Sequence, residues 1–349
     1  MDPIEIIGGG LSGLAAAVVL ARQGQAVTIF EKKRYPCVKL CGEFLSPEGL
    51  VALGRVSQCP LPELVTQLEL RPTKKFSWVS RRGRTLSVDL EPGGWAVRRD
   101  VLDPWLATLA SGLGAEVRFG AAGEPTAPRQ LWATGKEHSG LKSPYFAIKG
   151  YVRESENGKD VLHGRDIVLY QLRGGYIGFT RMQDGALSYC ALFDRARTDA
   201  AWRYTNWDQL CAGVFTTNSE LRRWAPGARV LLASHVGAAM FDFETRAAVR
   251  EGRWYAGDAV QLVPPFVGDG MSMAIEGGEL AARALLLGQS AAEYQAAWRK
   301  HFAPRVRTAK MLHPLLWMKF AHEPAISILR RMPGVVQWLY AQTRGDYAA

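Results

Sequence analysis

The sequence has few cysteines and histidines, and none of them is spaced for a metal or for a paired redox site. The five cysteines are Cys37, Cys41, Cys59, Cys190 and Cys211. No Cys-x-x-Cys pair occurs, and the six histidines are scattered rather than grouped with them. An odd, scattered set in a chain without an export signal indicates reduced thiols. We therefore expect no metal site.

Long apolar runs are also missing. No run reaches the length of about 18 residues that a membrane-spanning helix needs. Residues 3–7, PIEII, already read as a strand, and no signal sequence precedes them. Both absences favour the cytoplasm, with peripheral binding to the inner face of the membrane as an alternative.

The chain has 349 residues and a composition that is ordinary for a globular protein, with 48% hydrophobic and 22% charged residues. This length allows a large core and two structural lobes. The net charge of +10 fits a soluble protein of high pI, or a polyanionic partner such as NAD(P)H, an acidic carrier protein or an anionic membrane. No stripe of Lys and Arg with interleaved aromatics indicates nucleic acid. The sequence does not indicate an oligomeric state.

A glycine-rich turn follows the first strand. In GGGLSG, the residues Gly8, Gly10 and Gly13 occupy the three glycine positions of G-x-G-x-x-G. These glycines allow a tight turn, a close approach of the backbone to a pyrophosphate, and close contact between helix and strand. The helix that starts there directs free N–H groups and a positive dipole toward the phosphates.

An Ala-rich helix and a second strand complete a βαβ unit. Gly24 suits the C-cap of this helix, and the strand at 27–31 ends in Glu31. Glu31 stands 18 residues after Gly13, near the roughly 20 expected for an acid that binds ribose. The order of these features predicts a site for FAD or NAD(P). The alternative is a glycine-rich turn that binds nothing.

A second glycine-rich region lies within 254–282. Gly257 and Asp258 end a short strand, and the GDG stretch at 268–270 precedes a helix. A carboxylate beside a second helix N-terminus suits a flavin, because it accepts hydrogen bonds from ribityl hydroxyls while the helix stabilises charge on the reduced ring. We therefore favour FAD as the bound cofactor. A loop-to-helix joint with packing glycines is the alternative.

The middle of the chain alternates between apolar and polar residues. Residues 145–195 and the shorter set at 74–90 show a period of two, broken by Gly-containing turns. We expect one antiparallel sheet that covers the flavin, with Tyr176, Phe179 and Tyr189 or their neighbours on its inner face. Plain sheet core is the alternative role for each aromatic residue.

The residues after 290 are helical in pattern, with many apolar and basic side chains. Such a segment can lie on a membrane or admit an apolar substrate. The alternative is a pair of helices that caps the cofactor domain. Pro314, Pro324 and Pro333 divide the segment into short pieces, which favours the cap.

Three segments together carry a family resemblance. GGGLSG with Glu31, VRRDVLDPWL at 97–106 and GDAVQLVPPFVGDGM at 257–271 resemble FAD-dependent oxidoreductases of the para-hydroxybenzoate hydroxylase and geranylgeranyl reductase type. The resemblance covers most of the chain. It implies an α/β fold with a Rossmann-like FAD-binding domain of the GR2 type, an antiparallel β-sheet substrate domain and C-terminal helices. The domains would be 1–72, 97–138 and 246–300 for FAD, 73–96 and 139–245 for substrate, and 301–349 for a helical cap.

The resemblance also assigns roles in the stretch KLCGEFLSPEG at 39–49. Geranylgeranyl reductases carry a similar K-x-C-G segment beside the flavin, and flavin halogenases carry a similar G-E-x-L-x-P, so Cys41 would lie near the ring system. The alternative for Cys41 is a small core residue. Glu43 is either a general acid, if burial raises its pKa, or a cap for a helix that starts near Ser46. Arg99 would touch the flavin nucleotide; the alternative is an exposed cation at a helix start.

Three departures from the family patterns bear on function. Thr134 replaces an aspartate that helps hydroxylases bind FAD and NADPH, which weakens the assignment of a fast aromatic hydroxylase. Only Tyr176 matches the Y-x-W-x-F-P strand of archaeal geranylgeranyl reductases, which argues against an isoprenoid chain. No W-x-W occurs, although halogenases carry W-x-W-x-I-P. We therefore do not expect halogenation.

The combined prediction is an FAD-dependent oxidoreductase, with a monooxygenase for an apolar or aromatic, polyketide- or lipid-like molecule favoured and NAD(P)H as reductant. The alternatives are a geranylgeranyl-reductase-like enzyme that reduces a carbon–carbon double bond, and a non-catalytic flavin-binding electron carrier. The predicted catalytic residues are Cys41 and Glu43, and the predicted substrate contacts are Phe44, Tyr176, Tyr189 and Phe266. The predicted cofactor contacts are Gly8, Gly10, Leu11, Ser12, Gly13, Glu31, Lys32, Lys39, Cys41, Gly42, Arg99, Gly257, Asp258, Pro265, Gly268, Gly270 and Met271.

Overall fold

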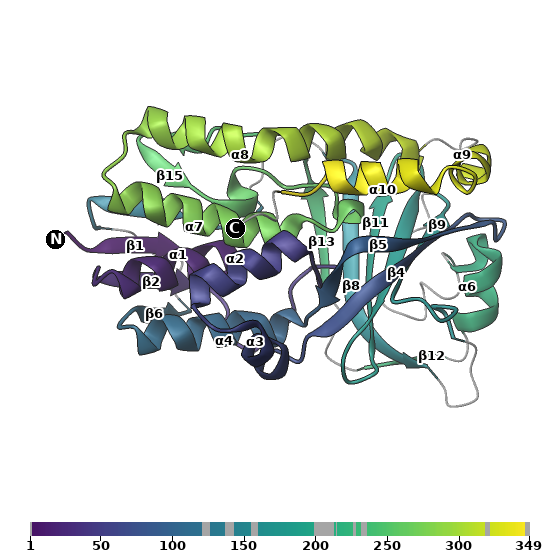
Figure 1. Cartoon of the computed structure of the whole chain (residues 1–349), viewed down its shortest axis with the longest axis horizontal. Helices are drawn as coiled ribbons and strands as arrows, with labels where there is room; N and C mark the ends of the chain where they lie inside the picture. The colour runs from purple at the N-terminus through teal and green to yellow at the C-terminus, as the bar shows by residue number, and fades with distance from the viewer. Residues whose placement is uncertain are drawn as a thin grey trace.

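Two β-sheets lie side by side, and a layer of helices runs along both of them (Figure 1). The computed structural model describes residues 2–120, 126–136, 143–154, 160–198, 213, 215–225, 228–231, 236–317 and 322–345. Cys211 lies outside these residues.

The first sheet has the strand order β14-β15-β7-β1-β2-β6 and is parallel from β15 to β6. Its central strand β1 has Ile4 and Ile6 fully buried, as expected for a parallel sheet covered on both faces. The strands are β1 (Ile4–Ile7), β2 (Val27–Glu31), β6 (Glu116–Phe119), β7 (Arg129–Trp132), β14 (Val249–Arg250) and β15 (Arg253–Tyr255).

The helices of this half pack around α1. The alanines of α1 are buried, and their small side chains allow close packing between helices. A side chain added at Gly278 of α7 would lie 2.1 Å from the carbonyl oxygen of Ser12, so α7 crosses α1 at backbone contact. The helices are α1 (Leu11–Arg22), α2 (Pro47–Ser57), α3 (Leu61–Gln67), α4 (Arg99–Gly112), α7 (Gly270–Leu286) and α8 (Ala291–Leu312).

The second sheet is mostly antiparallel and has the order β12-β8-β11-β10-β9-β4-β5-β3, with β13 also paired to β8. Tight turns with Gly174 and Gly185 at positive φ join its central hairpins, as the sequence predicts. The strands are β3 (Phe44–Leu45), β4 (Arg71–Val79), β5 (Thr85–Ala96), β8 (Tyr145–Glu154), β9 (Ile167–Leu172), β10 (Gly175–Arg181), β11 (Leu187–Asp194), β12 (Ala228–Val230) and β13 (Val236–Phe241).

The two faces of the second sheet have different cores. One face packs against α6 (Ser219–Trp224) and includes Phe179, Tyr189 and Trp224. The other face, called the inner face below, includes Tyr176 and Leu192 and packs against Trp317. It continues along β8 to Lys149 and Tyr151, which contact the cofactor half of the chain.

The last helices cover the inner face. After α8 come a 3₁₀ turn at His313–Trp317, then α9 (His322–Leu329) and α10 (Pro333–Gln342), and both of these helices contact β5. Among the described residues, no helix is long and apolar enough to cross a membrane.

The predicted division of the chain can be compared with the two sheets. Strands of the first sheet fall in the segments expected for cofactor binding, and β5 and β8–β13 fall in those expected for substrate, as does β4 except for its first two residues. The short β3 is an exception because it pairs with β5 of the second sheet. The boundary expected at residue 300 is wrong as a structural break, since α8 continues through it.

Candidate functional site

The glycines of the first turn are needed for two different reasons. Gly8 has φ +110°, and a side chain there would lie 2.2 Å from the carbonyl oxygen of Ala133. A side chain at Gly13 would lie 2.0 Å from the oxygen of Gly8. Both positions therefore need glycine for the fold itself. Gly10 differs, because a side chain there would meet no described atom within 4 Å and its φ of −82° suits any residue.

An unpartnered hydroxyl lies directly after this open glycine. Ser12, in the first turn of α1, is buried, and its Oγ has no hydrogen-bond partner among the described residues. Such a group normally finds a partner, because leaving it unpaired costs about 1–3 kcal/mol. A side chain added at Gly257 would lie 2.8 Å from Cβ of Ser12, so the second glycine region meets α1 at this point.

Asp258 follows Gly257 in a 3₁₀ turn at Gly257–Ala259. Its carboxylate is half-buried, and the described residues offer it no hydrogen bond or ion pair at contact distance. Burial raises the pKa of Asp258 to about 6, and the charge of Arg99 opposes this rise. The site therefore contains a carboxylate with free acceptor capacity beside the N-terminus of α1.

Arg99 begins α4 and is buried rather than exposed. Its guanidinium donates to both oxygens of Asp103, at 2.6 and 2.8 Å, and also interacts with the Cys41 thiol. The alternative of an exposed cation is wrong, because only 13% of this side chain is accessible. The bidentate pair fixes the direction of Arg99 toward Cys41 and Asp258.

The Glu31 carboxylate forms hydrogen bonds with nearby backbone, including the glycine-rich turn. Its carboxylate accepts from the backbone N–H of Gly9 and of Lys33, both at 2.9 Å, and lies 3.7 Å from Nζ of Lys39. Tyr35 donates to the carbonyl oxygen of Gly9 and thereby covers the same turn. Lys32, also predicted as a contact, is exposed.

Glu43 is the buried centre of the KLCGEFLSPEG stretch. It has φ 59° and is fully buried. One carboxylate oxygen accepts from the backbone N–H of Arg99 at 2.9 Å and from the hydroxyl of Tyr151 at 2.5 Å. The other lies 2.5 Å from Nζ of Lys149. The helix that Glu43 caps is therefore α4, and not α2, which begins at Pro47 as the sequence predicts.

Lys149 was not predicted as a site residue. It is fully buried on β8, and it donates to Oγ of Ser188 at 2.7 Å besides its ion pair with Glu43. Its cross-strand neighbour is Cys190. One sequence signal could have found Lys149, since a cation at an inward position of the apolar stretch YFAIKGYV contradicts the alternating pattern.

Two thiols flank the Glu43–Lys149 pair. Cys41 accepts a hydrogen bond from the backbone N–H of Glu43 at 3.3 Å, and Cys190 lies across the strand from Lys149. Burial raises the pKa of Cys190 to about 12 and also raises that of Cys41. Both thiols are therefore protonated near neutral pH and are poor nucleophiles in this state. Gly42, between Cys41 and Glu43, is exposed and accepts from Thr180 at 3.3 Å.

An aromatic cluster continues along the inner face. Of the four predicted substrate contacts, Phe44, Tyr176 and Phe266 pack into this cluster. Trp317 donates to Nε2 of His313 at 3.0 Å, and burial lowers the pKa of His313 to about 4, so this imidazole is neutral near neutral pH.

Tyr189 is not part of the aromatic cluster. The expectation that Tyr176, Phe179 and Tyr189 share the inner face is wrong. Phe179 pairs with Tyr189, and residues three apart on one strand, such as Tyr176 and Phe179, point to opposite faces. Phe179 and Tyr189 pack against α6 instead.

The second predicted helix N-terminus is that of α7. A 3₁₀ turn at Pro265–Val267 leads into Gly268, which has φ +68°, and α7 begins at Gly270. A side chain at Gly270 would have only one neighbour, 3.8 Å away on Val263. Met271 is buried in the core of the first sheet.

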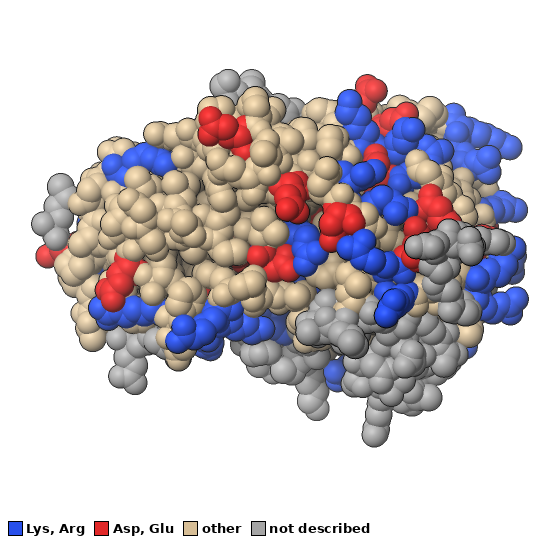
Figure 2. Space-filling model, turned by 90° about the horizontal axis from the view of Figure 1, so that it is seen from below, with Lys and Arg blue, Asp and Glu red and all other residues tan. Residues whose placement is uncertain are grey.

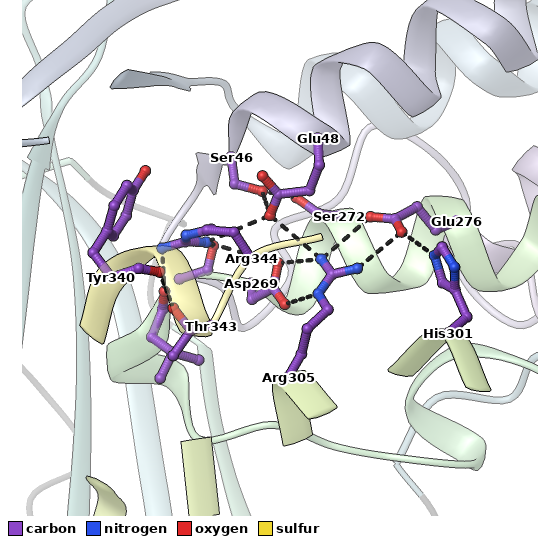
Figure 3. Close-up of polar contacts among 12 residues, drawn as sticks. Ser46, Glu48, Asp269, Ser272, Glu276, His301, Arg305, Tyr340, Thr343 and Arg344 are labelled. Carbon is purple, nitrogen blue, oxygen red and sulfur yellow. Dashed lines mark hydrogen bonds and ion pairs between the residues drawn. The ribbon is translucent and has the colours of Figure 1, made fainter. Parts of the chain in front are cut away.

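A polar network holds this loop from the side of α8 and the C-terminus (Figure 3). Arg305 donates to both oxygens of Asp269, at 3.0 and 2.7 Å, and to Glu276 at 2.8 Å. Arg344 donates to the carbonyl oxygen of Val267 at 2.6 Å and lies 3.8 Å from Glu48. Burial raises the pKa of Asp269, and both arginines oppose this rise. Four segments of the chain are thus tied to the loop before α7.

Comparison with known proteins identifies the fold. A family model described as an NAD(P)-binding Rossmann-like domain matches residues 6–40. The structure titled flavin-dependent brominase Bmp2 has a TM-score of 0.75 at 15% identity and covers 99% of this chain and 94% of its own. The chain has the fold of these proteins. The predicted fold class is thereby confirmed.

Two further structures have the same fold. A flavoprotein/dehydrogenase from Cytophaga hutchinsonii has a TM-score of 0.69 at 16% identity and covers 94% of this chain and 92% of its own. The myxobacterial chondrochloren halogenase CndH, described as a variant of FAD-dependent halogenases, has a TM-score of 0.69 at 15% identity, with coverages of 96% and 90%. No curated protein sequence matches the chain.

Proposed function

We propose that the protein is an FAD-dependent oxidoreductase that acts on an apolar or aromatic small molecule, with oxygen transfer as the favoured reaction. The observation that carries this proposal is the polar cradle at the start of α1. Gly10 leaves open space that the fold does not require, Ser12 has an unpartnered hydroxyl, and Asp258 has a carboxylate with free acceptor capacity. A dinucleotide uses an open glycine at a helix N-terminus for its pyrophosphate, and polar groups with free hydrogen-bonding capacity beside it suit its hydroxyls.

The residues present fit the polar parts of FAD. The first turn of α1, with Gly10 and Ser12, would bind the pyrophosphate, and Glu31 has lone pairs left for a ribose hydroxyl. Asp258 would accept from ribityl hydroxyls, and the N-terminus of α7 at Gly270 would stabilise charge on the polar edge of the ring. The same fold in solved flavin-dependent proteins supports this fit.

FAD, when bound, supplies the electron transfer and oxygen chemistry that side chains lack. The protein's own contribution is a fixed charge pair. Lys149 and Glu43 are buried on the inner face, with their hydrogen bonds already formed. Lys149 can hold a negative charge or deliver a proton at Nζ, and Tyr151 can do the latter at its hydroxyl. Since both neighbouring thiols are protonated, we assign Cys41 and Cys190 to the wall of the site.

The aromatic cluster next to this pair supports the proposed class of substrate. Tyr176, Phe44 and Phe266 belong to a buried apolar region between the inner face and the last helices. Such a region excludes water and favours an aromatic or aliphatic molecule over a charged one.

Reconstitution with FAD tests the proposal. The Gly10→Ala variant should keep the melting temperature of the apoprotein, because its new side chain meets no described atom, but should lose most bound flavin absorbance. Gly112→Ala is a matched control, since that position is also open but lies at the far end of α4. Equal flavin content in the parent protein, Gly10→Ala and Gly112→Ala would contradict the proposal.

Turnover separates the possible reactions. Oxygen uptake coupled to NAD(P)H oxidation and an oxygenated product supports the monooxygenase. Anaerobic reduction of an alkene supports the alternative of a carbon–carbon double-bond reductase. Reversible flavin reduction without turnover of any substrate supports an electron carrier.

Halogenation is a second candidate because two of the structures with this fold are named a brominase and a halogenase. The missing W-x-W argues against it. Products from reactions with and without bromide, compared by mass spectrometry, decide between halogenation and oxygenation.

A further inference from the structure

The last two helices, α9 and α10, differ between the side that faces the sheet and the outer face that points away from it. Ile326 of α9 is fully buried, and Val336 and Tyr340 of α10 pack against the aromatic cluster. Gln337 and Tyr340 also donate to carbonyl oxygens of Glu91 and Pro92 on β5. These contacts of the sheet-facing side account for how the two helices are held to the sheet.

The outer face is apolar and exposed. Ile328, Met332 and Trp338 are 56%, 48% and 58% exposed, although they are large hydrophobic residues. The sequence of α10, PGVVQWLYAQ, contains no charged residue, and none of its residues is fully buried. A surface helix normally turns charged residues toward water. Large exposed apolar residues that gather within one short stretch of surface helices indicate an interaction surface.

Unpaired cations border this apolar face. Arg330 and Arg331 lie between α9 and α10, and Arg82 lies on the β4–β5 hairpin; all three are exposed and have no side-chain partner among the described residues. Arg81, beside Arg82, has its pKa lowered chiefly by burial and also by the charges of Arg173 and Arg82. Figure 2, which views the molecule from below, shows Lys and Arg gathered at the end of the molecule where Figure 1 places α6 and this hairpin.

A cleft lies between the hairpin and the end of α9. Its volume is about 610 Å³, and it is lined by Gly83, Arg84, Thr85, Ser87 and Arg330. Arg84 is already paired with Glu323 and donates to Ser327, and Thr85 and Ser87 have hydrogen bonds to Gly83 and Ser77. Arg330 is therefore the cation of this lining that is free to bind an anionic group. Arg330 lines the cleft and lies between Ile328 and Met332 in the sequence, so the cleft opens beside the exposed apolar residues.

We propose that the outer face of α9 and α10 docks on an anionic phospholipid surface. Trp338, Met332 and Ile328 enter the interfacial layer, while Arg330 and Arg331 bind phosphate headgroups. Apolar residues with flanking arginines, and a tryptophan between water and lipid, are the combination that interfacial helices use.

Other partners explain only part of these observations. A second copy of the chain that met this face by two-fold symmetry would oppose the arginines of one copy to those of the other. Nucleic acid would engage the arginines but leave Ile328 and Met332 exposed. A phospholipid surface satisfies the cations and the apolar residues together. The inference is independent of the proposed function because it involves none of the residues assigned to FAD.

Co-sedimentation with vesicles tests this proposal. The whole protein is mixed with phosphatidylcholine vesicles, either pure or containing about 30% phosphatidylglycerol. We expect at least tenfold stronger binding to the anionic vesicles, weakened by 0.5 M salt, since about fivefold in affinity is expected from each arginine near the surface.

Two variants and two controls test which residues bind the vesicles. Met332→Ser/Trp338→Ser should lose at least fivefold in vesicle affinity, and Arg330→Gln/Arg331→Gln at least tenfold. Leu287→Ser, at the end of α7 and 74% exposed, controls for a lost apolar residue. Arg299→Gln/Lys300→Gln, exposed on α8, controls for lost charge. Each variant should keep the melting temperature of the parent protein.

Three outcomes would overturn the proposal. The first is that the parent protein fails to sediment with anionic vesicles. The second is that the test variants bind as well as the two controls. The third is a dimer in size-exclusion chromatography that Trp338→Ser abolishes, because a second copy would then cover this face.

Discussion

Two buried clusters of charge lie on either side of the candidate site, and they differ in the kind of cation they contain. In the cluster around Arg305, two arginines meet three carboxylates, those of Glu48, Asp269 and Glu276. In the cluster around Lys149, one ammonium group meets the one carboxylate of Glu43, and the remaining neighbours are hydroxyls and thiols.

The difference indicates different tasks. A guanidinium has a rigid fork of donors, and Arg305 uses it on both oxygens of Asp269, so it holds the loop before α7 in one geometry. An ammonium group is a compact charge on a flexible chain that can change protonation and position. Lys149 lies on the inner face beside two half-buried thiols, and its neighbours there are not fixed by a second ion pair. We infer that the first cluster supports the site and the second takes part in it.

The largest effect on stability is expected from Arg305→Met. This change leaves three buried carboxylates without their main cation, and breaking a buried ion pair costs about 3–5 kcal/mol. Thermal and urea unfolding should show the loss, whereas Arg299→Met, exposed on the same helix, should change neither. An unchanged melting temperature for Arg305→Met would mean that the network in Figure 3 does not stabilise the loop.

The next largest effect is expected from Lys149→Met, which leaves the charge of Glu43 buried and should cost about 3 kcal/mol. Adding Glu43→Gln should recover most of this stability, because the unpaired charge is then removed. Turnover should remain low in the double variant if the pair acts in the reaction. Recovery of turnover together with stability would assign the pair a purely structural role.

The contribution of Asp258 to stability can be measured from its dependence on pH. Its pKa in the folded protein, about 6, lies above the unfolded value near 4. The folded apoprotein therefore binds more protons between these values, and the stability from this group is present below about pH 4 and lost as pH rises through 6. The free energy of unfolding of the parent protein should decrease by on the order of 2 kcal/mol across this window because of Asp258. Asp258→Asn should abolish this decrease. Identical pH profiles by urea unfolding would contradict this assignment.

The smallest effect is expected from Tyr151→Phe, which removes one hydrogen bond to Glu43 and should cost about 1–2 kcal/mol. Tyr170→Phe is a matched control, because its hydroxyl donates at 2.5 Å to Val161 on the other face of the same sheet. Both variants should lose similar stability. Only Tyr151→Phe should change the spectrum of bound FAD, and equal spectra would place Tyr151 outside the site.

The sequence predicted well where structure depends on neighbours in the chain. The βαβ unit from Ile4 to Glu31, the start of α2 at Pro47 and the tight turns at Gly174 and Gly185 follow from short-range periodicity and from glycine conformations. Gly8 and Gly13 were identified as glycines that the turn needs. The sequence could not distinguish them from Gly10, since all three match one motif and only the packed structure shows which position is open.

Wrong or missing predictions concern contacts between distant segments. Tyr189 was placed on the inner face because alternation shows that a strand has two faces but does not say which one meets the cofactor half. One of the two alternatives for Glu43, besides a general acid, was a cap for the helix nearest in sequence, and Glu43 caps α4 instead. Lys149 was missed because its partner lies on another element.

The sequence by itself therefore determined the cofactor half in outline, because glycine geometry and hydrophobic period act over a few residues. Only the tertiary structure decided which charges meet. Tyr151 reaches Glu43 across 108 positions of the chain, and Arg305 reaches Glu48 across 257. Such pairs depend on the register of a whole sheet and on the path of helices over it, and no local pattern of residues contains that information.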